Sequence, residues 1–153
     1  MLESMNDETR AMDPEQPLQT DAELQDFLDG VLHEAAERQF WTFYLGPDDR
    51  LCGPVMPMND HPDRPDELAE TDDLGTVTFA QAMADRVNWI AEAVGAGSVV
   101  FVWERIGSER FGPYELAFAR AMSHECADIG LRLRAQFLLH DVGLRQITPD
   151  DYA

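Results

Sequence analysis

Hydrophobic residues recur at helical spacing in three stretches of the sequence, over residues 20–32, 78–94 and 112–129. In each stretch they return every three or four positions, which places them on one stripe of an α-helix. Each stretch also begins with a helix-start signal, Thr-x-x-Glu or Thr-x-x-Gln in the first two and Gly-Pro in the third. The pattern therefore predicts three amphipathic helices.

Shorter runs of β-branched and aromatic residues lie between these helices. Gln39–Leu45 is apolar on both faces, which is typical of a central strand covered on both sides. Leu51–Met58 follows a turn and predicts the return strand of a hairpin. Because Pro54 and Pro57 cannot donate ladder hydrogen bonds, we expect this strand at a sheet edge or bulged. Ser98–Trp103 is apolar throughout and predicts a buried strand that joins the sheet in parallel through a helical crossover.

The last part of the chain alternates between apolar and polar residues. In Leu131–His140 the alternation points Phe137 inward and Arg134 and Gln136 outward. A turn and a short strand, Leu144–Ile147, follow. The whole chain thus predicts the order α-β-β-α-β-α-β-β, an α+β fold with a mixed sheet and flanking helices.

Two segments lack any apolar periodicity. Residues 1–19 are rich in acids and proline, which indicates a disordered acidic tail and leaves 20–153 as a single domain. Residues 59–75 are also rich in proline and acids, and they contain His61. A connection of this length is uncommon inside a compact domain, so we expect a mobile acidic loop.

Charge is the most unusual feature of the composition. The chain has 30 acidic and 11 basic residues, a formal net charge of −19, and all of its basic side chains are arginine. Such a field repels nucleic acid and anionic membranes, so we expect neither as a direct partner. The charge suits a docking surface for a basic protein or a nucleic-acid mimic. It also suits a solvated surface that keeps the protein soluble, which is the commoner role.

The sequence contains no evident segment for export or membrane insertion. Residues 1–12 carry acids and no apolar core of a signal peptide, and the apolar runs are far shorter than the roughly 18 residues of a membrane helix. We therefore expect a cytoplasmic protein. Cys52 and Cys126 form neither a CxxC pair nor a disulfide framework, and Cys126 is predicted to be a small buried residue.

The usual motifs of catalysis and metal binding are absent from the sequence. It has no glycine-rich phosphate loop and no Gly-x-Ser-x-Gly elbow. His124 and Cys126 lie two positions apart on a predicted helix, so their side chains point about 200° apart and cannot bind one ion. A metal site would have to combine His140 with His61 of the loop. We therefore expect no metal and no cofactor.

Charged residues gather directly after the buried strand. Glu104 and Arg105 end it, and Arg110 and Glu115 follow in the next loop and helix. The ends of strands are where α/β sheets place ligand sites. A solvated, salt-bridged rim is the commoner explanation for such charges.

The order of elements in Val99–Val142 is similar to a segment of the JAB/MPN family, particularly its RadC-like branch. In both, a buried strand is followed by a loop that opens a helix, a glycine step and another strand. With the hairpin and the preceding helix, the resemblance covers roughly residues 39–147. It implies a JAB/MPN-like fold or a related small α/β sandwich. The overall pattern also resembles small actinobacterial proteins, for which it implies no role.

The resemblance does not extend to the family's zinc ligands. The family's His-x-His-Pro motif falls on Trp103 and Arg105, its serine falls near the start of the next helix, and its aspartate falls near Glu115. The strand 51–58 offers no glutamate to complete the set. Because tryptophan and arginine cannot ligate zinc, the resemblance implies a scaffold without the metal-dependent peptidase activity.

Three functions remain open from the sequence. The first is a non-catalytic binding or regulatory domain on a JAB-like scaffold that holds no metal. The second is a hydrolase in which Glu104 or Glu115 acts with His140 as acid and base. The third is an acidic interaction protein or nucleic-acid mimic that binds a basic partner. The candidate binding cleft consists of Trp103, Glu104, Arg105, Arg110, Glu115 and His140.

Overall fold

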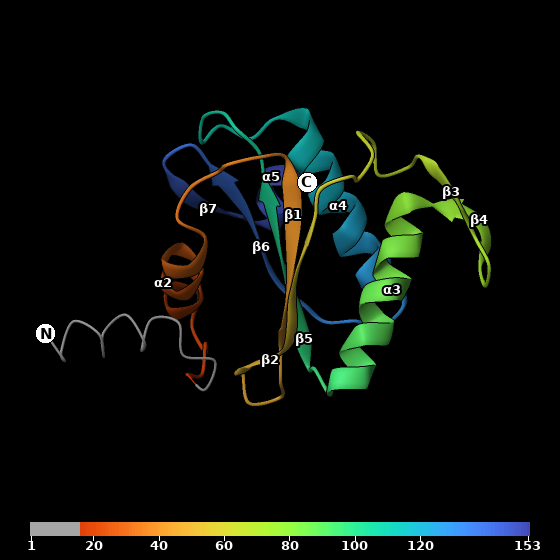
Figure 1. The fold of residues 1–153 in the computed structure, drawn as a ribbon, viewed down its shortest axis with the longest axis horizontal. Coiled ribbons are helices and arrows are strands. Elements are labelled where there is room, and N and C mark those ends of the chain that lie inside the picture. The colour runs from red at the N-terminus through yellow and green to blue at the C-terminus, as the bar shows by residue number, and fades with distance from the viewer. Residues whose placement is uncertain (1–15) are drawn as a thin grey trace, which may run out of the picture.

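The computed structural model describes residues 16–153, and the elements expected from the sequence form in the expected order (Figure 1). They make an α+β fold with a mixed five-stranded sheet, to which a two-stranded hairpin and a last helical turn are added. Within residues 16–153, no helix has the length and apolar character needed to cross a membrane. The elements are α2 (Asp21–Leu32), β1 (Gln39–Leu45), β2 (Leu51–Met58), β3 (Leu68–Thr71), β4 (Gly75–Thr78), α3 (Phe79–Val94), β5 (Ser98–Glu104), α4 (Pro113–Asp128), β6 (Leu133–His140), β7 (Gly143–Ile147) and α5 (Pro149–Tyr152).

The sheet has the strand order β2-β1-β5-β6-β7. β5 and β6 pair in parallel through a crossover that contains α4, and all other neighbours are antiparallel. β5 is antiparallel to its neighbour β1 and therefore runs parallel to β2, so α3 lies in the parallel crossover that the sequence predicted, with β1 between the two strands. β2 lies at an edge, as its prolines predicted, and its register with β1 shifts between Thr42 and Tyr44.

Helices cover both faces of the sheet, α2 on one face and α3 with α4 on the other (Figure 1). The alternation of side chains along the strands builds the two hydrophobic cores. In β1, Phe43 and Leu45 pack toward α2, whereas Phe40 and Tyr44 pack toward α3 and α4. Both faces of this central strand are therefore covered, as its apolar sequence predicted.

Reciprocal hydrogen bonds fix where the helices begin. The Thr20 hydroxyl accepts the backbone N–H of Glu23, and the Glu23 carboxylate accepts the backbone N–H of Thr20. α3 begins with the same arrangement. In α4 the Glu115 carboxylate accepts the backbone N–H of Gly112, so the sequence pattern that starts this helix also places a carboxylate at the end of the sheet.

The segment 59–75 is not the irregular loop that its composition suggested. It contains β3 and the first residue of β4, which form a hairpin beside α3. The hairpin was missed because its strands are only four residues long and largely exposed, so they carry no apolar alternation. His61 is also buried, with 7% of its surface exposed, although we expected it in a mobile loop.

The boundary predicted for the N-terminal tail is wrong at its C-terminal end. Residues 1–15 lie outside the described residues. Leu18 is 1% exposed in the core beside α2, and its N–H donates to the carbonyl of Asp49 at 2.7 Å. Pro17 forms an isolated bridge with Arg50. A single leucine among polar residues has no periodicity, which is why its sequence context placed it in the tail.

β6 is buried on both faces, although its sequence alternates. Gln136, which we expected to face solvent, is 3% exposed. Its side-chain oxygen accepts the indole N–H of Trp103 at 2.8 Å, and its amide nitrogen donates to the carbonyl of Ala119 at 2.9 Å. The polar side chain is stable in the core because both of its ends are hydrogen-bonded.

Cys126 is a buried thiol in α4, as predicted. It is 0% exposed in the core between the sheet and α3 and α4. Burial raises the pKa of this thiol to about 12, and the charge of Glu125 adds to the effect. The thiol is therefore protonated and unreactive at neutral pH.

The close approach of β2 to α3 gives a test of the packing. Gly53 has a φ of +69°, and a Cβ atom at this position would lie 3.0 Å from both methyl groups of Val94. We expect Gly53→Ala to lower the free energy of unfolding by more than the ~1–2 kcal/mol that a left-handed alanine costs alone. Gly75→Ala is the matched control, because Gly75 has a φ of +73° and nothing within 4 Å of its Cβ position. Urea unfolding measures both variants, and equal losses would contradict crowding at Val94.

Candidate functional site

A pocket of about 300 Å³ opens at the end of the sheet where β5 finishes and α4 begins. β1 starts at the same end, and the segment after β2 also reaches it, so parts of the chain that are far apart in sequence meet there (Figure 1). The volume is at the lower limit for small-molecule sites. The lining residues are Arg38, Gln39, His61, Asp63, Trp103, Glu104, Arg105, Tyr114, Glu115 and Phe118.

An aromatic cluster forms the inner part of the site. Trp103 of β5 packs against Phe118 of α4 with ring centroids 5.1 Å apart, and against Phe40 of β1 at 4.8 Å. The His61 ring makes edge contacts with Phe40 at 5.3 Å and with Phe118 at 5.5 Å. Such contacts stabilise aromatic pairs beyond the burial of their surface. Rings from three elements and the segment after β2 thus fix one another in place.

His61 is a buried imidazole within this cluster. Its Nδ1 atom has no hydrogen-bond partner among residues 16–153. Burial lowers the pKa of His61 to about 4, and the charge of Arg38 acts in the same direction. The Met58 carbonyl and the carboxylates of Asp60 and Asp63 have smaller, opposite effects. His61 is therefore neutral at pH 7, with one donor and one acceptor nitrogen.

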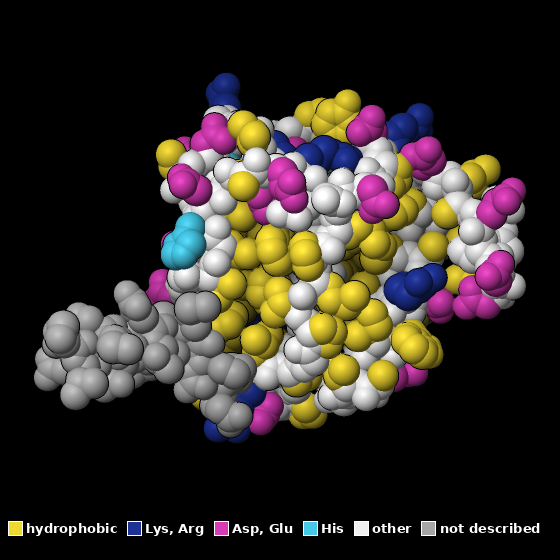
Figure 2. Space-filling model, in the orientation of Figure 1, with side chains coloured by type: hydrophobic (Ala, Val, Ile, Leu, Met, Phe, Trp, Pro, Cys, Tyr) yellow, Lys and Arg dark blue, Asp and Glu magenta, His cyan; other side chains and the backbone are white. Residues whose placement is uncertain are grey.

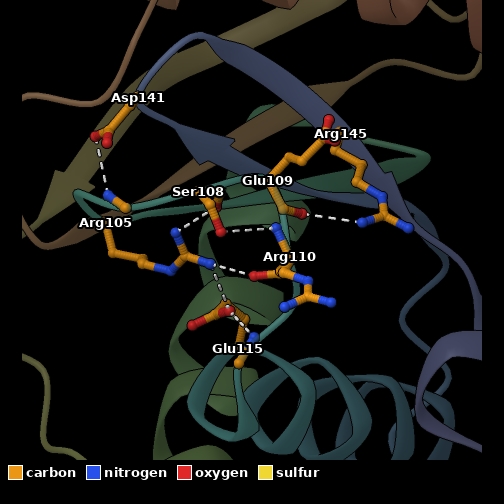
Figure 3. Close-up of polar contacts among 9 residues, drawn as sticks. Arg105, Ser108, Glu109, Arg110, Glu115, Asp141 and Arg145 are labelled. Carbon is orange, nitrogen blue, oxygen red and sulfur yellow. Dashed lines mark hydrogen bonds and ion pairs between the residues drawn. The ribbon is translucent and has the colours of Figure 1, made fainter.

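Arg105 joins the loop after β5 to the start of α4 (Figure 3). Its guanidinium donates to the carbonyls of Ser108 at 2.7 Å and Arg110 at 2.6 Å, and to the Glu115 carboxylate at 3.1 Å. The same carboxylate accepts the backbone N–H of Gly112. The side chains of Arg105 and Glu115 are 22% and 6% exposed, so solvent screens this ion pair only weakly and its geometry is well defined.

Glu104 points to the opposite face of β5 and is held by four neutral N–H donors. Its Oε2 atom accepts the backbone N–H groups of Ala36 at 2.7 Å and Glu37 at 3.0 Å. Its Oε1 atom accepts side-chain N–H groups of Gln39 at 2.9 Å and Trp41 at 2.8 Å. Burial acts to raise the pKa of the Glu104 carboxyl, but the four hydrogen bonds together outweigh it and lower the pKa. An ionised carboxylate thus ties the start of β1 to the end of β5.

Four of the six residues proposed from the sequence converge on the pocket. They come together because the strand end and the start of the next helix occupy the same edge of the sheet, as the sequence order suggested. Their roles differ, since the tryptophan belongs to the aromatic cluster while the charged residues hold the surrounding chain. The four are Trp103, Glu104, Arg105 and Glu115.

The other two proposed residues, Arg110 and His140, do not line the pocket. The side chain of Arg110 is exposed, and only its carbonyl takes part by accepting Arg105. His140 is 4% exposed at the end of β6, where its Nδ1 atom accepts the N–H of Val142 at 3.4 Å. Closeness in sequence and strand order suggested both residues, but the local path of the chain directs their side chains elsewhere.

Six lining residues were not proposed from the sequence: Arg38, Gln39, His61, Asp63, Tyr114 and Phe118. The Arg38 guanidinium donates to the carbonyls of His61 at 2.8 Å and Pro62 at 2.7 Å, and so fixes the segment after β2 beside the pocket. No local motif signals this contact, because the partners are 23 and 24 positions away. Tyr114 could have been found, since it precedes Glu115 in the first turn of the predicted helix.

In the overlay expected from the sequence, Trp103 and Arg105 take the positions of the JAB/MPN family's two zinc-binding histidines, and both side chains line the pocket. Neither side chain offers zinc a lone pair. Glu115, near the aspartate position, is bound to Arg105 and Gly112. No catalytic step through a metal-bound water can be derived from this set of residues.

A second group of possible ligands lies on α4, away from this pocket. His124, Glu125 and Asp128 bring ligand atoms within 4.8 Å of one another. The Nε2 atom of His124 lies 3.4 Å from Oδ2 of Asp128, four residues further along the helix. An exposed histidine and carboxylate at this spacing are ordinary neighbours on a helix surface, and this contact accounts for the group.

No model of a known protein family matches the sequence, and no curated protein matches it either.

The buried imidazole predicts a pH dependence of stability. The pKa of His61 is about 4 in the folded protein and 6.5 as its ordinary value, so the unfolded chain binds this proton more readily. Its contribution to stability is fully present above pH 6.5 and is lost as the pH falls toward 4. Between pH 6.5 and 4 this histidine accounts for up to ~3 kcal/mol of the loss in the free energy of unfolding, and we expect His61→Phe to remove that part of the loss. Urea unfolding between these pH values measures it, with His124→Gln on the exposed face of α4 as the control. An unchanged slope in His61→Phe would contradict the assignment.

The carboxylate of Glu104 predicts a loss that depends on charge. In Glu104→Gln an amide NH₂ would face two of the four donors, so we expect about 2–3 kcal/mol less stability at neutral pH. Because the folded pKa of Glu104 lies below its ordinary 4.5, this stabilisation is present above pH 4.5 and is lost as the pH falls through the folded pKa. The variant and the wild type should therefore converge in acid. Urea unfolding tests this, with the exposed Glu37→Gln as the matched control, and a difference that persists in acid would argue against charge as the cause.

Proposed function

We propose that this protein is a non-catalytic binding domain that holds a small ligand in the pocket at the end of β5. The proposal rests on the convergence of an aromatic cluster and internally bonded polar groups around a volume of about 300 Å³. Small-molecule sites usually combine an apolar wall with a few oriented polar groups. A neutral, ring-containing ligand suits this combination best, because it can stack on the aromatic wall without requiring a free charge.

The charged groups of the pocket already have internal partners. An Nη2 atom of Arg38 lies 3.5 Å from Oδ1 of Asp63, and Arg105 lies 3.1 Å from Glu115. Each oxygen of Glu104 accepts two hydrogen bonds. Groups held in this way can orient a ligand without first rearranging, which lowers the entropic cost of binding.

The same bonds weigh against the hydrolase alternative. A general base must be within hydrogen-bond reach of the proton that it takes. Glu104 has both oxygens saturated, and Glu115 is bound to Arg105 and to the N-terminus of α4. His140, the histidine of that alternative, is absent from the lining of the pocket.

The resemblance to the JAB/MPN family supports the same proposal. Trp103 and Arg105 stand at the positions of the family's zinc-binding histidines, Glu115 stands near its aspartate, and all three line the pocket. We therefore propose a metal-free scaffold similar to that family, with an aromatic ring and an ion pair at the place of the metal.

A fragment screen by NMR tests the binding function. We expect neutral aromatic fragments to shift the indole N–H signal of Trp103 and the backbone signals of residues 38, 61 and 115. Tyr114→Ala removes an exposed ring at the edge of the pocket, so it should weaken these fragments about tenfold. Val142→Ala, at an exposed position on the β6–β7 turn, is the control and should leave the affinity unchanged.

Two outcomes would contradict the proposal. Fragments that bind elsewhere, or that bind equally to Tyr114→Ala, would remove the pocket as the site. New NMR signals from a chemically converted fragment would contradict the absence of catalysis.

A further inference from the structure

A second surface of the molecule, formed by β2 and the side of α3 next to it, has the features of a protein-binding site. β2 has the sequence Leu-Cys-Gly-Pro-Val-Met-Pro-Met, which contains no polar side chain other than one thiol. The strand lies at the edge of the sheet, and residues 53–57 are all exposed. An edge strand of this composition without charged residues is a surface that proteins normally cover.

A shallow groove runs along the α3 side of this strand. It has a volume of about 60 Å³ and is lined mainly by methionines and aliphatic residues, among them Met56, Met58, Met83 and Ile90. Trp89 of α3 is 68% exposed, and it follows Arg86, which lines the groove, by one helical turn. Figure 2 shows hydrophobic side chains gathered across the middle of this side of the molecule, with charged side chains around them. We name β2 and this groove the apolar face.

The apolar face is poorly suited to pair with another strand. Pro54 and Pro57 have no N–H to donate, and the positive φ of Gly53 lies where the β1–β2 register shifts. An extended segment would therefore form few backbone hydrogen bonds along β2. A helix that packs its apolar side against this face needs no backbone hydrogen bonds from β2, so this mode of binding suits the surface. Methionine side chains favour this mode because they adapt to the shape of the partner.

Charge determines which helix fits. Two copies of this chain would each bring a formal net charge of −19, so self-association through this face is opposed by repulsion. Asp48 and Asp49 precede β2 and Asp60 follows it, while Arg50 is paired with Asp48 and Arg86 lies in the groove. The local charges are nearly balanced, so it is the net charge of −19 on the whole chain that favours a positively charged partner.

We propose that the apolar face binds a basic amphipathic helix of a partner protein. The apolar side of that helix packs on β2 and in the groove, and its lysines and arginines meet the surrounding carboxylates. This proposal does not require a ligand in the pocket, because no residue lines both sites, although β1 contributes to each.

The test uses two synthetic amphipathic helices of about 18 residues with the same leucine positions, one carrying lysine and the other glutamate on its polar side. Isothermal titration calorimetry should detect binding of the lysine peptide alone, and the binding should weaken as salt is added. Met56→Ser removes an exposed side chain of the groove without changing the charge, and should weaken binding about tenfold. Val142→Ser is the matched control, since Val142 is an exposed apolar residue on the β6–β7 turn.

Amide chemical shifts of the wild-type protein provide a measurement that does not depend on variants. The lysine peptide should shift signals of β2 and α3. The pocket variant Tyr114→Ala should bind the peptide as the wild type does, which separates this proposal from the first. Equal binding of both peptides, shifts confined to other acidic surfaces, or the same affinity in Met56→Ser would overturn it. A dimer seen by sedimentation and lost in Met56→Ser would overturn it as well, by making a second copy the occupant.

Discussion

The carboxylate of Glu104 connects the parts of the molecule that form the pocket. It accepts backbone N–H groups from the turn before β1 and side-chain N–H groups from β1 itself, while its own residue ends β5. β1 and β5 are neighbouring strands at the centre of the sheet. The Glu104 carboxylate therefore fixes the start of one central strand against the end of the other. Arg105 extends the arrangement on the other face of β5, through the following loop to α4. Two adjacent residues therefore hold the two sides of the site, because the pleat of one strand directs them apart.

The structural elements that could be predicted are those with a local signal in the sequence. The long helices, the covered β1 and the edge position of β2 all follow from periodicity, capping residues or proline. Leu18 and the β3–β4 hairpin have no such pattern, since one is a single buried residue and the other is short and exposed. Gln136 is a different case. Apolar and polar residues do alternate along β6, but the predicted exposure of Gln136 was wrong because its hydrogen bond with Trp103 allows the side chain to be buried.

The site was predictable only as far as it is continuous in sequence. The lining residues that were found follow one strand into the next helix. Arg38 and His61 reach the pocket through a contact between two separate connections, and nothing in either connection specifies the other. The same limit applies to the apolar face. The prolines of β2 predicted that it is an edge strand. The groove, however, depends on the close approach of β2 to α3, which the missing side chain of Gly53 permits.

The strand order of the sheet also governs how the chain can assemble. β1 with β2 and β6 with β7 are joined by short turns, so these pairs require little loop closure. The pairing of β1 with β5 brings together Gln39 and Glu104, which are 65 positions apart. Contacts between distant residues form slowly because the entropy of closing the loop opposes them. We therefore expect the central pairing to form after the hairpins, so that the step which completes the sheet is also the step which creates the pocket.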